Sequence, residues 1–174
     1  MINTTAIDAM TDKLLTQTLL DDTAQQASAS TRLRKNHNFH ALDERVQRFI
    51  NVMQPGTYVR PHCHHRDPGV NGFEFFLVLQ GSIGILVFDE RGQVIRQHRV
   101  SDRGSVRAIE LSEGTYHTLV ALAPNTAMLE IKEGPYSAKT DKAFMSNFPE
   151  EGTPESQACV AAWEYYFQKS FAST

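Results

Sequence analysis

The stretch "PGTYVRPHCHHRDPGVNGFEFFLVLQGSIGILVFDE", residues Pro55 to Glu90, decides how this sequence is interpreted. It carries His62 and His64 one residue apart, and Glu74 opens the apolar run that follows. Residues two apart in a strand project to the same face, so the two imidazoles are predicted to point one way. A carboxylate on the inward face of the next strand is costly to bury without a cation partner. The stretch therefore leaves two interpretations open: His62, His64 and Glu74 share a metal ion, or the histidines are solvent-facing residues of a loop.

The segment between residues 46 and 135 is predicted to be rich in β-strands. Short apolar or alternating runs recur there between glycine and proline turn signals, namely "VQRFINV", "FEFFLVLQG", "SIGILVFD", "QVIRQHRV", "YHTLVALA" and "AMLEIKE". "FDERGQV" is typical of a hairpin with its turn near Arg91–Gly92. Many short strands with regular turns indicate a sandwich or barrel, of which the jelly roll is one form. His117, after the glycine turn in "EGTYHT", is a fourth candidate ligand.

Helices are predicted on both sides of this β-rich segment. In "TAIDAMTDKLLTQTLLDDTAQQASAS" the helical spacing is carried by Ile7, Met10, Leu14 and Leu15. This helix is either continuous or broken near Asp21 and Asp22, and "STRLRKNHNFHALDER" is predicted to follow it as a polar connection. Near the other end, Thr153-Pro154-Glu155 predicts a helix start, and one apolar face is formed by Val160, Trp163 and Phe167. That face is expected to pack against the barrel or another subunit.

Length, composition and charge argue against several classes of protein. With 174 residues the chain is predicted to form one domain that can bury a core of its own. A net charge of −3 without a basic run argues against nucleic-acid binding. Its apolar runs are only strand-length and its beginning does not resemble a signal peptide. The two cysteines, Cys63 and Cys159, do not suggest a disulfide framework, so the expected location is the cytoplasm.

The ligand types narrow the choice of metal. Three imidazoles and a carboxylate suit iron, nickel, manganese, copper or zinc better than calcium or magnesium, which prefer oxygen ligands. Cys63 and His65 alternate away from the predicted ligands, so Cys63 is expected to be a buried thiol and His65 a loop residue. Asp67 is expected to serve in a turn rather than as a ligand.

The spacing of these residues resembles that of the cupin superfamily. The first cupin motif is matched by Gly56, His62, His64, Glu74 and Gly81, and "GTYH", residues 114–117, resembles the core of the second motif. More narrowly, the chain is similar to the WbuC family of cupin metalloproteins in "RLRKNHNFH", "VQRFINVMQPGTYVRPHCHH", "EFFLVLQGSIGILVFDERG", "EGTYHTLVAL" and "EIKEGPY".

The resemblance implies a mainly β, single cupin jelly-roll domain over residues 1–174. Its parts would be a helical arm at 1–35, a β-barrel at 46–135 and an extension with a helix at 136–174. It also implies one divalent transition metal ion (Fe, Zn, Ni or Mn) held by His62, His64, Glu74 and His117. By analogy with other cupins, a homodimer is expected.

Two features depart from the cupin pattern. Nine residues separate His64 from Glu74, where the first motif usually has three or four. The insertion, "HRDPGVNGF", contains turn signals and is predicted to be an enlarged loop. In the second motif, Ser112 replaces the usual proline and Ala121 stands where asparagine is frequent. Neither position is a ligand, so the prediction of a metal site is unaffected.

A substrate site is predicted beside the metal. Guanidinium groups bind phosphate or carboxylate bidentately, so the basic stretch "TRLRKNHNFH" is expected to form a pocket lip for an anion, or else a solvated connector. The candidate substrate-binding residues are Arg32, Arg34, Asn36, Arg60, Lys132 and Tyr136. The candidate proton-transfer residues are Glu130, His40 and Tyr58.

WbuC-like proteins are associated with O-antigen and other surface-polysaccharide pathways, and the resemblance implies no single reaction. The first hypothesis is a metal-dependent isomerase or epimerase acting on an anionic or nucleotide sugar. The second is an iron-dependent dioxygenase-type oxidoreductase, which rests on analogy of fold and ligand set. The third is a non-catalytic cupin that binds a metal or a sugar.

Overall fold

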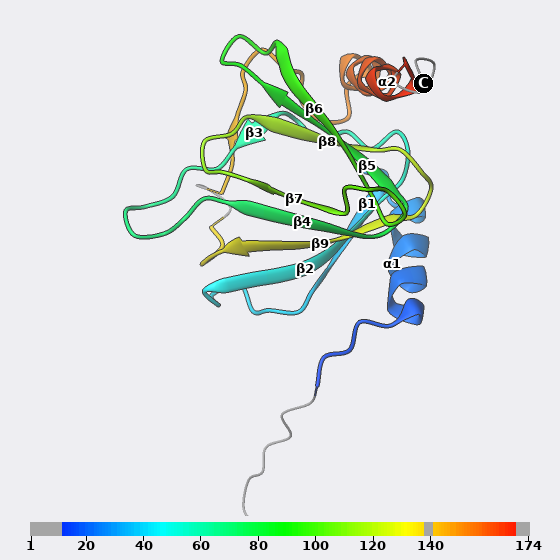
Figure 1. Ribbon diagram of the computed structural model, residues 1–174, viewed down its shortest axis with the longest axis vertical. Coiled ribbons are helices and arrows are strands. Elements are labelled where there is room, and N and C mark those ends of the chain that lie inside the picture. The colour runs from blue at the N-terminus through cyan, green and yellow to red at the C-terminus, as the bar shows by residue number, and fades with distance from the viewer. Residues whose placement is uncertain (1–11, 138–140, 170–174) are drawn as a thin grey trace, which may run out of the picture.

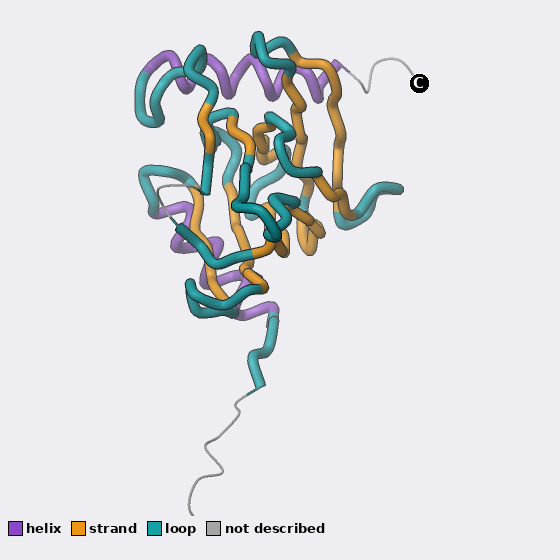
Figure 2. The backbone as a smooth tube through the Cα atoms, turned by 90° about the vertical axis from the view of Figure 1, so that its left-hand side faces the viewer, coloured by secondary structure: helices purple, strands orange, loops and turns teal. Residues whose placement is uncertain are grey.

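A computed structural model describes residues 12–137 and 141–169. Within these residues, two five-stranded antiparallel sheets face each other, with strand orders β1-β2-β9-β4-β7 and β10-β3-β8-β5-β6 (Figures 1 and 2). The elements in chain order are α1 (Gln17–Ala29), β1 (Arg34–Asn38), β2 (Val46–Met53), β3 (His62–Cys63), β4 (Glu74–Gln80), β5 (Ser82–Phe88), β6 (Val94–Ser101), β7 (Ala108–Leu111), β8 (His117–Ala121), β9 (Thr126–Glu133), β10 (Ala143–Phe144) and α2 (Pro154–Lys169).

The main core lies between the two sheets. On β4 the alternation of the sequence is preserved, because Phe76 and Val78 point into this core on the same face as Glu74. On β5 every residue is buried, because the strand is covered on both faces. Ile85 enters the main core and Leu86 enters a second cluster under α2. The continuous apolar run "SIGILVF" therefore follows from burial on two sides.

Helix α1 covers the outer face of the first sheet at β1 and β2 (Figure 1). Thr16 caps it, because its side chain accepts a hydrogen bond from the Leu19 amide at 3.1 Å. The predicted helix was wrong about Leu14 and Leu15, which precede this cap and are exposed. No break occurs at the two aspartates, because they lie on the exposed side of the helix. Ile7 and Met10, which were also assigned to this helix, lie outside the described residues.

The predicted polar connection contains a strand that sequence reasoning missed. β1 pairs with β2 in the register Asn36↔Asn51 and Asn38↔Phe49. It lacks the usual apolar alternation because it is an edge strand whose inner side lines a polar cavity. The short strands β7 and β10 were missed as well.

Helix α2 begins at Pro154 as predicted, and Thr153 accepts a hydrogen bond from the Ser156 amide at 3.2 Å. Trp163 and Phe167 are buried against the outer face of β5 and β8. A Cβ atom at Gly84 would lie 2.3 Å from the Phe167 ring. Glycine is therefore needed at this position of β5, so that the helix can approach the strand closely.

Candidate metal centre

The three histidines and the glutamate come from facing sheets and meet inside the barrel. His62 on β3 is the cross-strand partner of His117 on β8, and His64 follows directly after β3. Glu74 enters from the opposite sheet as the first residue of β4. All four side chains are buried, and one ligand atom from each lies within 4.8 Å of the others.

The backbone orients each imidazole. The Nδ1 atom of His62 lies 2.9 Å from the Arg60 carbonyl oxygen, and that of His117 lies 2.9 Å from the Thr115 carbonyl oxygen. His64 makes the same kind of contact with the Asp141 carbonyl. When Nδ1–H donates to these carbonyls, each Nε2 is left unprotonated with its lone pair free. This is the tautomer that a metal ligand requires.

The cluster fits a divalent metal ion. Glu74 lies 3.0 Å from both His64 Nε2 and His117 Nε2. Nevertheless, His64 Nε2 and Glu74 Oε2 are buried without a hydrogen bond to any described residue. Such orphaned atoms are rare unless they serve a ligand. Burial lowers the pKa of His62 well below its ordinary value, which keeps this imidazole neutral and able to bind metal.

The enlarged loop between His64 and Glu74 is tied to its surroundings. The Glu113 carboxylate accepts hydrogen bonds from the Arg66 amide at 2.7 Å and the Gly72 amide at 3.1 Å. Glu133 accepts another from the Asn71 amide. The insertion therefore leaves both ligands in place, because its two ends are held by one carboxylate. Asp67 forms a turn, its carbonyl accepting from Val70, which agrees with the predicted role.

An acid–base cluster lies beside the metal-ligand residues. On the inner face of the first sheet, Lys132 is the cross-strand partner of Glu74, and Glu130 is the partner of Phe76. The Lys132 ammonium lies 3.8 Å from the Glu130 carboxylate and 3.9 Å from that of Glu74. This pairing brings a buried cation and a second carboxyl to the mouth of the barrel.

The charge states of this cluster follow from burial and proximity. Burial and the adjacent Glu74 charge raise the pKa of Glu130 to about 8. Burial opposes ionisation of Glu74, but the close contacts with the His117 and His64 imidazoles hold its pKa well below the ordinary value. Burial alone would lower the pKa of Lys132, yet the surrounding carboxylates raise it, so this group stays charged. Two neighbouring carboxyls with separated pKa values suit acid–base chemistry.

Asp141 belongs to this site and was missed in the sequence. Its buried carboxylate binds Lys132 at 3.1 Å and Arg66 at 2.8 Å, while its carbonyl contacts His64 Nδ1. Burial would raise the pKa of Asp141, but the Lys132 charge and the Arg66 hydrogen bond hold it below its ordinary value. No local motif marks this residue, because two of its partners, His64 and Arg66, are 77 and 75 residues away in the sequence.

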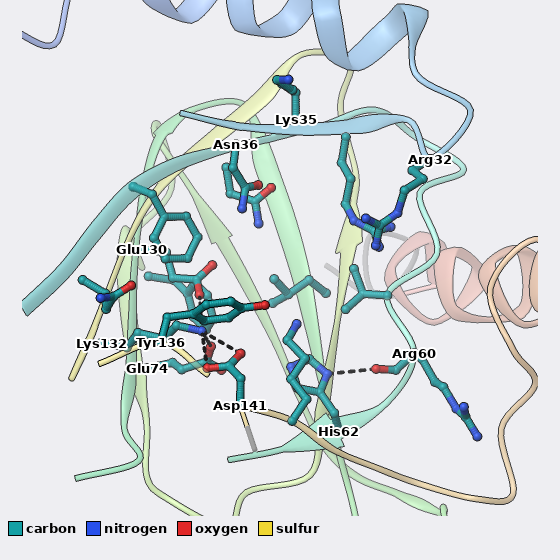
Figure 3. A pocket seen from close by; sticks show the side chains of 18 of the residues that line it. Arg32, Lys35, Asn36, Arg60, His62, Glu74, Glu130, Lys132, Tyr136 and Asp141 are labelled. Atoms are coloured by element: carbon teal, nitrogen blue, oxygen red, sulfur yellow. Dashed lines mark hydrogen bonds and ion pairs between the residues drawn. The ribbon is translucent and has the colours of Figure 1, made fainter. Parts of the chain in front are cut away.

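A cavity of about 930 Å³ opens beside the cluster (Figure 3). Six residues predicted to bind substrate line it, together with His40 and Glu130; the six are Arg32, Arg34, Asn36, Arg60, Lys132 and Tyr136. Asn38 and Asn51 add further amide groups to the wall. Lys132, Glu130 and Asp141 lie on one side of the cavity, and Arg32 and Arg60 lie on the other (Figure 3).

Two predicted proton-transfer residues are placed less favourably. Tyr58 does not line the cavity, because its ring stacks on Trp163 and its hydroxyl donates to the Pro149 carbonyl at 2.7 Å. His40 does line the cavity, but its Nδ1 lies 2.7 Å from the Arg48 carbonyl oxygen and is engaged with the backbone. Glu130 is thus the best placed of the three.

The residues between and beside the ligands behave as predicted. Cys63 is fully buried on the opposite side of the strand from the histidines, and its sulfur lies 3.3 Å from His65 Nε2. His65 itself is exposed in the loop. Neither side chain belongs to the metal-ligand cluster.

Comparisons with known proteins agree with this architecture. A family model described as "Domain of unknown function (DUF6016)" matches residues 15–100. Among solved structures, the capsular polysaccharide assembling protein CapF from Staphylococcus aureus is 22% identical with a TM-score of 0.52. The match covers 67% of this chain and 32% of that one, so this chain spans about a third of the length of CapF. The chain has the cupin fold. No curated protein matches this sequence.

Other solved cupin-like structures are similar at lower scores. KdgF from Halomonas sp. is 17% identical with a TM-score of 0.46, over 61% of this chain and 83% of that chain. A cupin superfamily protein from Desulfitobacterium hafniense is 16% identical with a TM-score of 0.44, over 57% and 76%. Among the described helices of this chain, none has the length and apolar character to span a membrane.

Proposed function

We propose that this cupin is a metal-dependent enzyme that isomerises or epimerises an anionic sugar of surface-polysaccharide or nucleotide-sugar metabolism. One observation carries the proposal. A single cavity is lined by the metal-ligand residues His62, Glu74 and His117, by the buried pair Glu130 and Lys132, and by several arginines. A place for a metal, a proton-transfer group and anion-binding groups are thereby combined.

The proposed chemistry assigns a separate role to each side of the cavity. A bound divalent ion would polarise a carbonyl or hydroxyl oxygen of the substrate as a Lewis acid. Glu130 takes a proton from the carbon beside that carbonyl and returns it at the end of the reaction, so no oxidant is required. The Lys132 ammonium, next to Glu130, stabilises negative charge that develops on the substrate.

Further residues that line the cavity support the choice of substrate. The amides of Asn36, Asn38 and Asn51 are suited to hydroxyl groups, and the Asn51 Oδ1 atom is buried without a described partner. Arg32 and Arg34 offer planar donors for a carboxylate or phosphate. The name of the CapF protein, which refers to capsular polysaccharide, is consistent with a sugar substrate.

Metal content is the first test of this proposal. We expect mass spectrometry to find about one equivalent of a transition metal in the purified protein, because three imidazoles and a carboxylate are a ligand set typical of such ions. His62→Ala and His117→Ala are expected to lose it, and Glu74→Gln to bind it more weakly. A wild-type protein that stays empty after reconstitution with iron, nickel, manganese and zinc would contradict the proposal.

Turnover separates the remaining hypotheses. An isomerase converts a nucleotide sugar or sugar phosphate without consuming oxygen, and Glu130→Gln retains the metal but loses turnover. Oxygen uptake that depends on ferrous iron would instead favour the dioxygenase. Stabilisation by a sugar without turnover would favour a binding protein. The nucleotide moiety and the homodimer stay predictions, and sedimentation equilibrium measures the latter.

A further inference from the structure

The arginines that line the cavity are already paired with carboxylates from the same chain. Glu151 accepts hydrogen bonds from Arg32 Nε at 3.1 Å and Arg32 Nη2 at 2.9 Å. It also lies 2.7 Å from Arg34 Nη1. Arg60 pairs with Glu150 and lies over the Phe144 ring at 5.3 Å. The guanidinium groups at one side of the cavity are therefore bound in the manner expected for a carboxylate or phosphate ligand.

The two glutamates lie on a segment that is fixed at both ends. We call residues 145–153 the strap, since they connect β10 to α2 past the cavity. The Met145 amide donates to the Pro61 carbonyl at 2.9 Å, and the Tyr58 hydroxyl donates to the Pro149 carbonyl at 2.7 Å. Helix α2 holds the other end through its packing on the barrel. The strap backbone is thus well anchored, and only the glutamate side chains need to move for the arginines to be released.

The exposed fractions of the Arg34 and Glu151 side chains indicate which of the two can move away when a ligand anion binds. The Arg34 side chain is 16% exposed and also donates to the Tyr58 carbonyl at 2.6 Å, so its position does not depend on Glu151 alone. The Glu151 side chain is 34% exposed and can turn toward solvent. A partly exposed ion pair contributes little to stability and can be replaced at low cost.

We propose that Glu151 is an internal counter-anion that occupies the oxyanion-binding place of Arg32 and Arg34 until a substrate carboxylate or phosphate displaces it. This inference rests on the proposed function, because it assumes an anionic substrate. Glu151 then sets specificity as well as affinity. A ligand with a strong oxyanion displaces the carboxylate, whereas a neutral sugar of the same shape leaves it in place and gains nothing from the arginines.

The expected size of the effect follows from competition. The apparent affinity of a ligand is reduced by the fraction of time that its site is available. If Glu151 occupies the arginines for about nine-tenths of the time, its removal strengthens anion binding about tenfold. Added salt screens the partly exposed charges, so the difference between variant and wild type is expected to shrink at high ionic strength.

The test is calorimetric titration of the full chain with inorganic phosphate, for wild type, Glu151→Gln and Asp102→Asn. Asp102 is the matched control, because it pairs with Arg103 at 3.9 Å, does not line the cavity, and its change alters net charge equally. We expect about tenfold tighter binding for Glu151→Gln and no change for Asp102→Asn. The gain should be lost when Arg34→Gln is combined with Glu151→Gln. Equal affinity of wild type and Glu151→Gln would overturn the proposal, as would an equal gain in the control.

A second variant and a separate readout keep this result interpretable. If Glu151→Gln does not fold, Glu151→Asp takes its place in the test. This variant retains the charge but withdraws the carboxylate by one methylene, so it should also bind phosphate more tightly than wild type. A folded Glu151→Asp that binds like wild type would overturn the proposal. Titrations are run with metal-loaded and with chelator-treated protein. If the wild type does not convert any sugar but the Glu151 variant binds phosphate more tightly, the isomerase proposal alone is rejected. If the wild type converts a sugar but the variant binds phosphate no more tightly, the counter-anion proposal alone is rejected.

Discussion

At the scale of single residues, Asp141 links the metal-ligand cluster to the charged side of the cavity. Its carboxylate forms ion pairs with both Lys132 and Arg66, and all three side chains are buried. We expect Asp141→Asn to destabilise the protein by about 3–5 kcal/mol, because breaking a buried ion pair leaves its partners uncompensated. The carboxylate also lies 4.0 Å from His64 Nδ1, and its ion pairs hold the backbone carbonyl that orients this imidazole, so metal affinity should fall about tenfold or more. Denaturant unfolding and competition with a chelating dye measure the two effects.

The control for this prediction is Asp67→Asn, which removes an exposed carboxylate from the nearby loop. Unchanged stability of Asp141→Asn would contradict the assigned role.

Asp141 also marks the limit of prediction from sequence. His62, His64 and Glu74 were found because local spacing and strand alternation bring them together. Asp141 meets His64 from 77 residues away, and only the fold creates that contact.

At the scale of elements, Glu113 clamps the loop between His64 and Glu74 through the Arg66 and Gly72 amides. These hydrogen bonds hold the pKa of Glu113 below its ordinary value of 4.5. A depressed carboxyl pKa contributes stability above the ordinary value, and this stability is lost as pH falls through the lower folded value. We therefore expect the Arg66 and Gly72 amides to exchange hydrogen faster in Glu113→Gln at neutral pH.

Wild type is expected to approach that faster exchange only below about pH 4.5, after correction for the intrinsic rate. Glu110→Gln, an exposed change on β7, is the matched control and should leave the loop unaffected. Protection of both amides in Glu113→Gln equal to wild type would show that the clamp is unimportant. The loop was recognised in the sequence from its turn signals, but the clamp was not, since Glu113 comes from the segment before β8.

The elements themselves were predictable where burial produces a pattern. β4 shows alternation, and α2 shows an apolar face after a cap, and both were predicted. β1 was taken for a connection because its inner face lines a polar cavity instead of the core. The start of α1 was misplaced, since Leu14 and Leu15 match the helical period but lie before the Thr16 cap. A strand that lines a polar cavity thus lacks the alternation by which strands are recognised in a sequence.

At the scale of the whole molecule, the proposed metal joins the two sheets. Three ligands belong to the sheet that contains β3 and β8, and Glu74 belongs to the sheet that contains β4 and β9. A metal that binds only the folded state stabilises it by about 2.7 kcal/mol at a free concentration 100 times its dissociation constant. For a chain of this size that corresponds to a rise in melting temperature of roughly 5–10 °C.

We accordingly expect saturating metal to raise the melting temperature of wild type, and chelation to reverse the rise. His117→Ala should melt at the same temperature with and without metal, because one sheet then retains too few ligands. His98→Ala on β6 is the control, being remote from the cluster, and should respond like wild type. Differential scanning calorimetry measures all three. A metal-dependent rise that persists in His117→Ala would contradict a site that needs all four ligands.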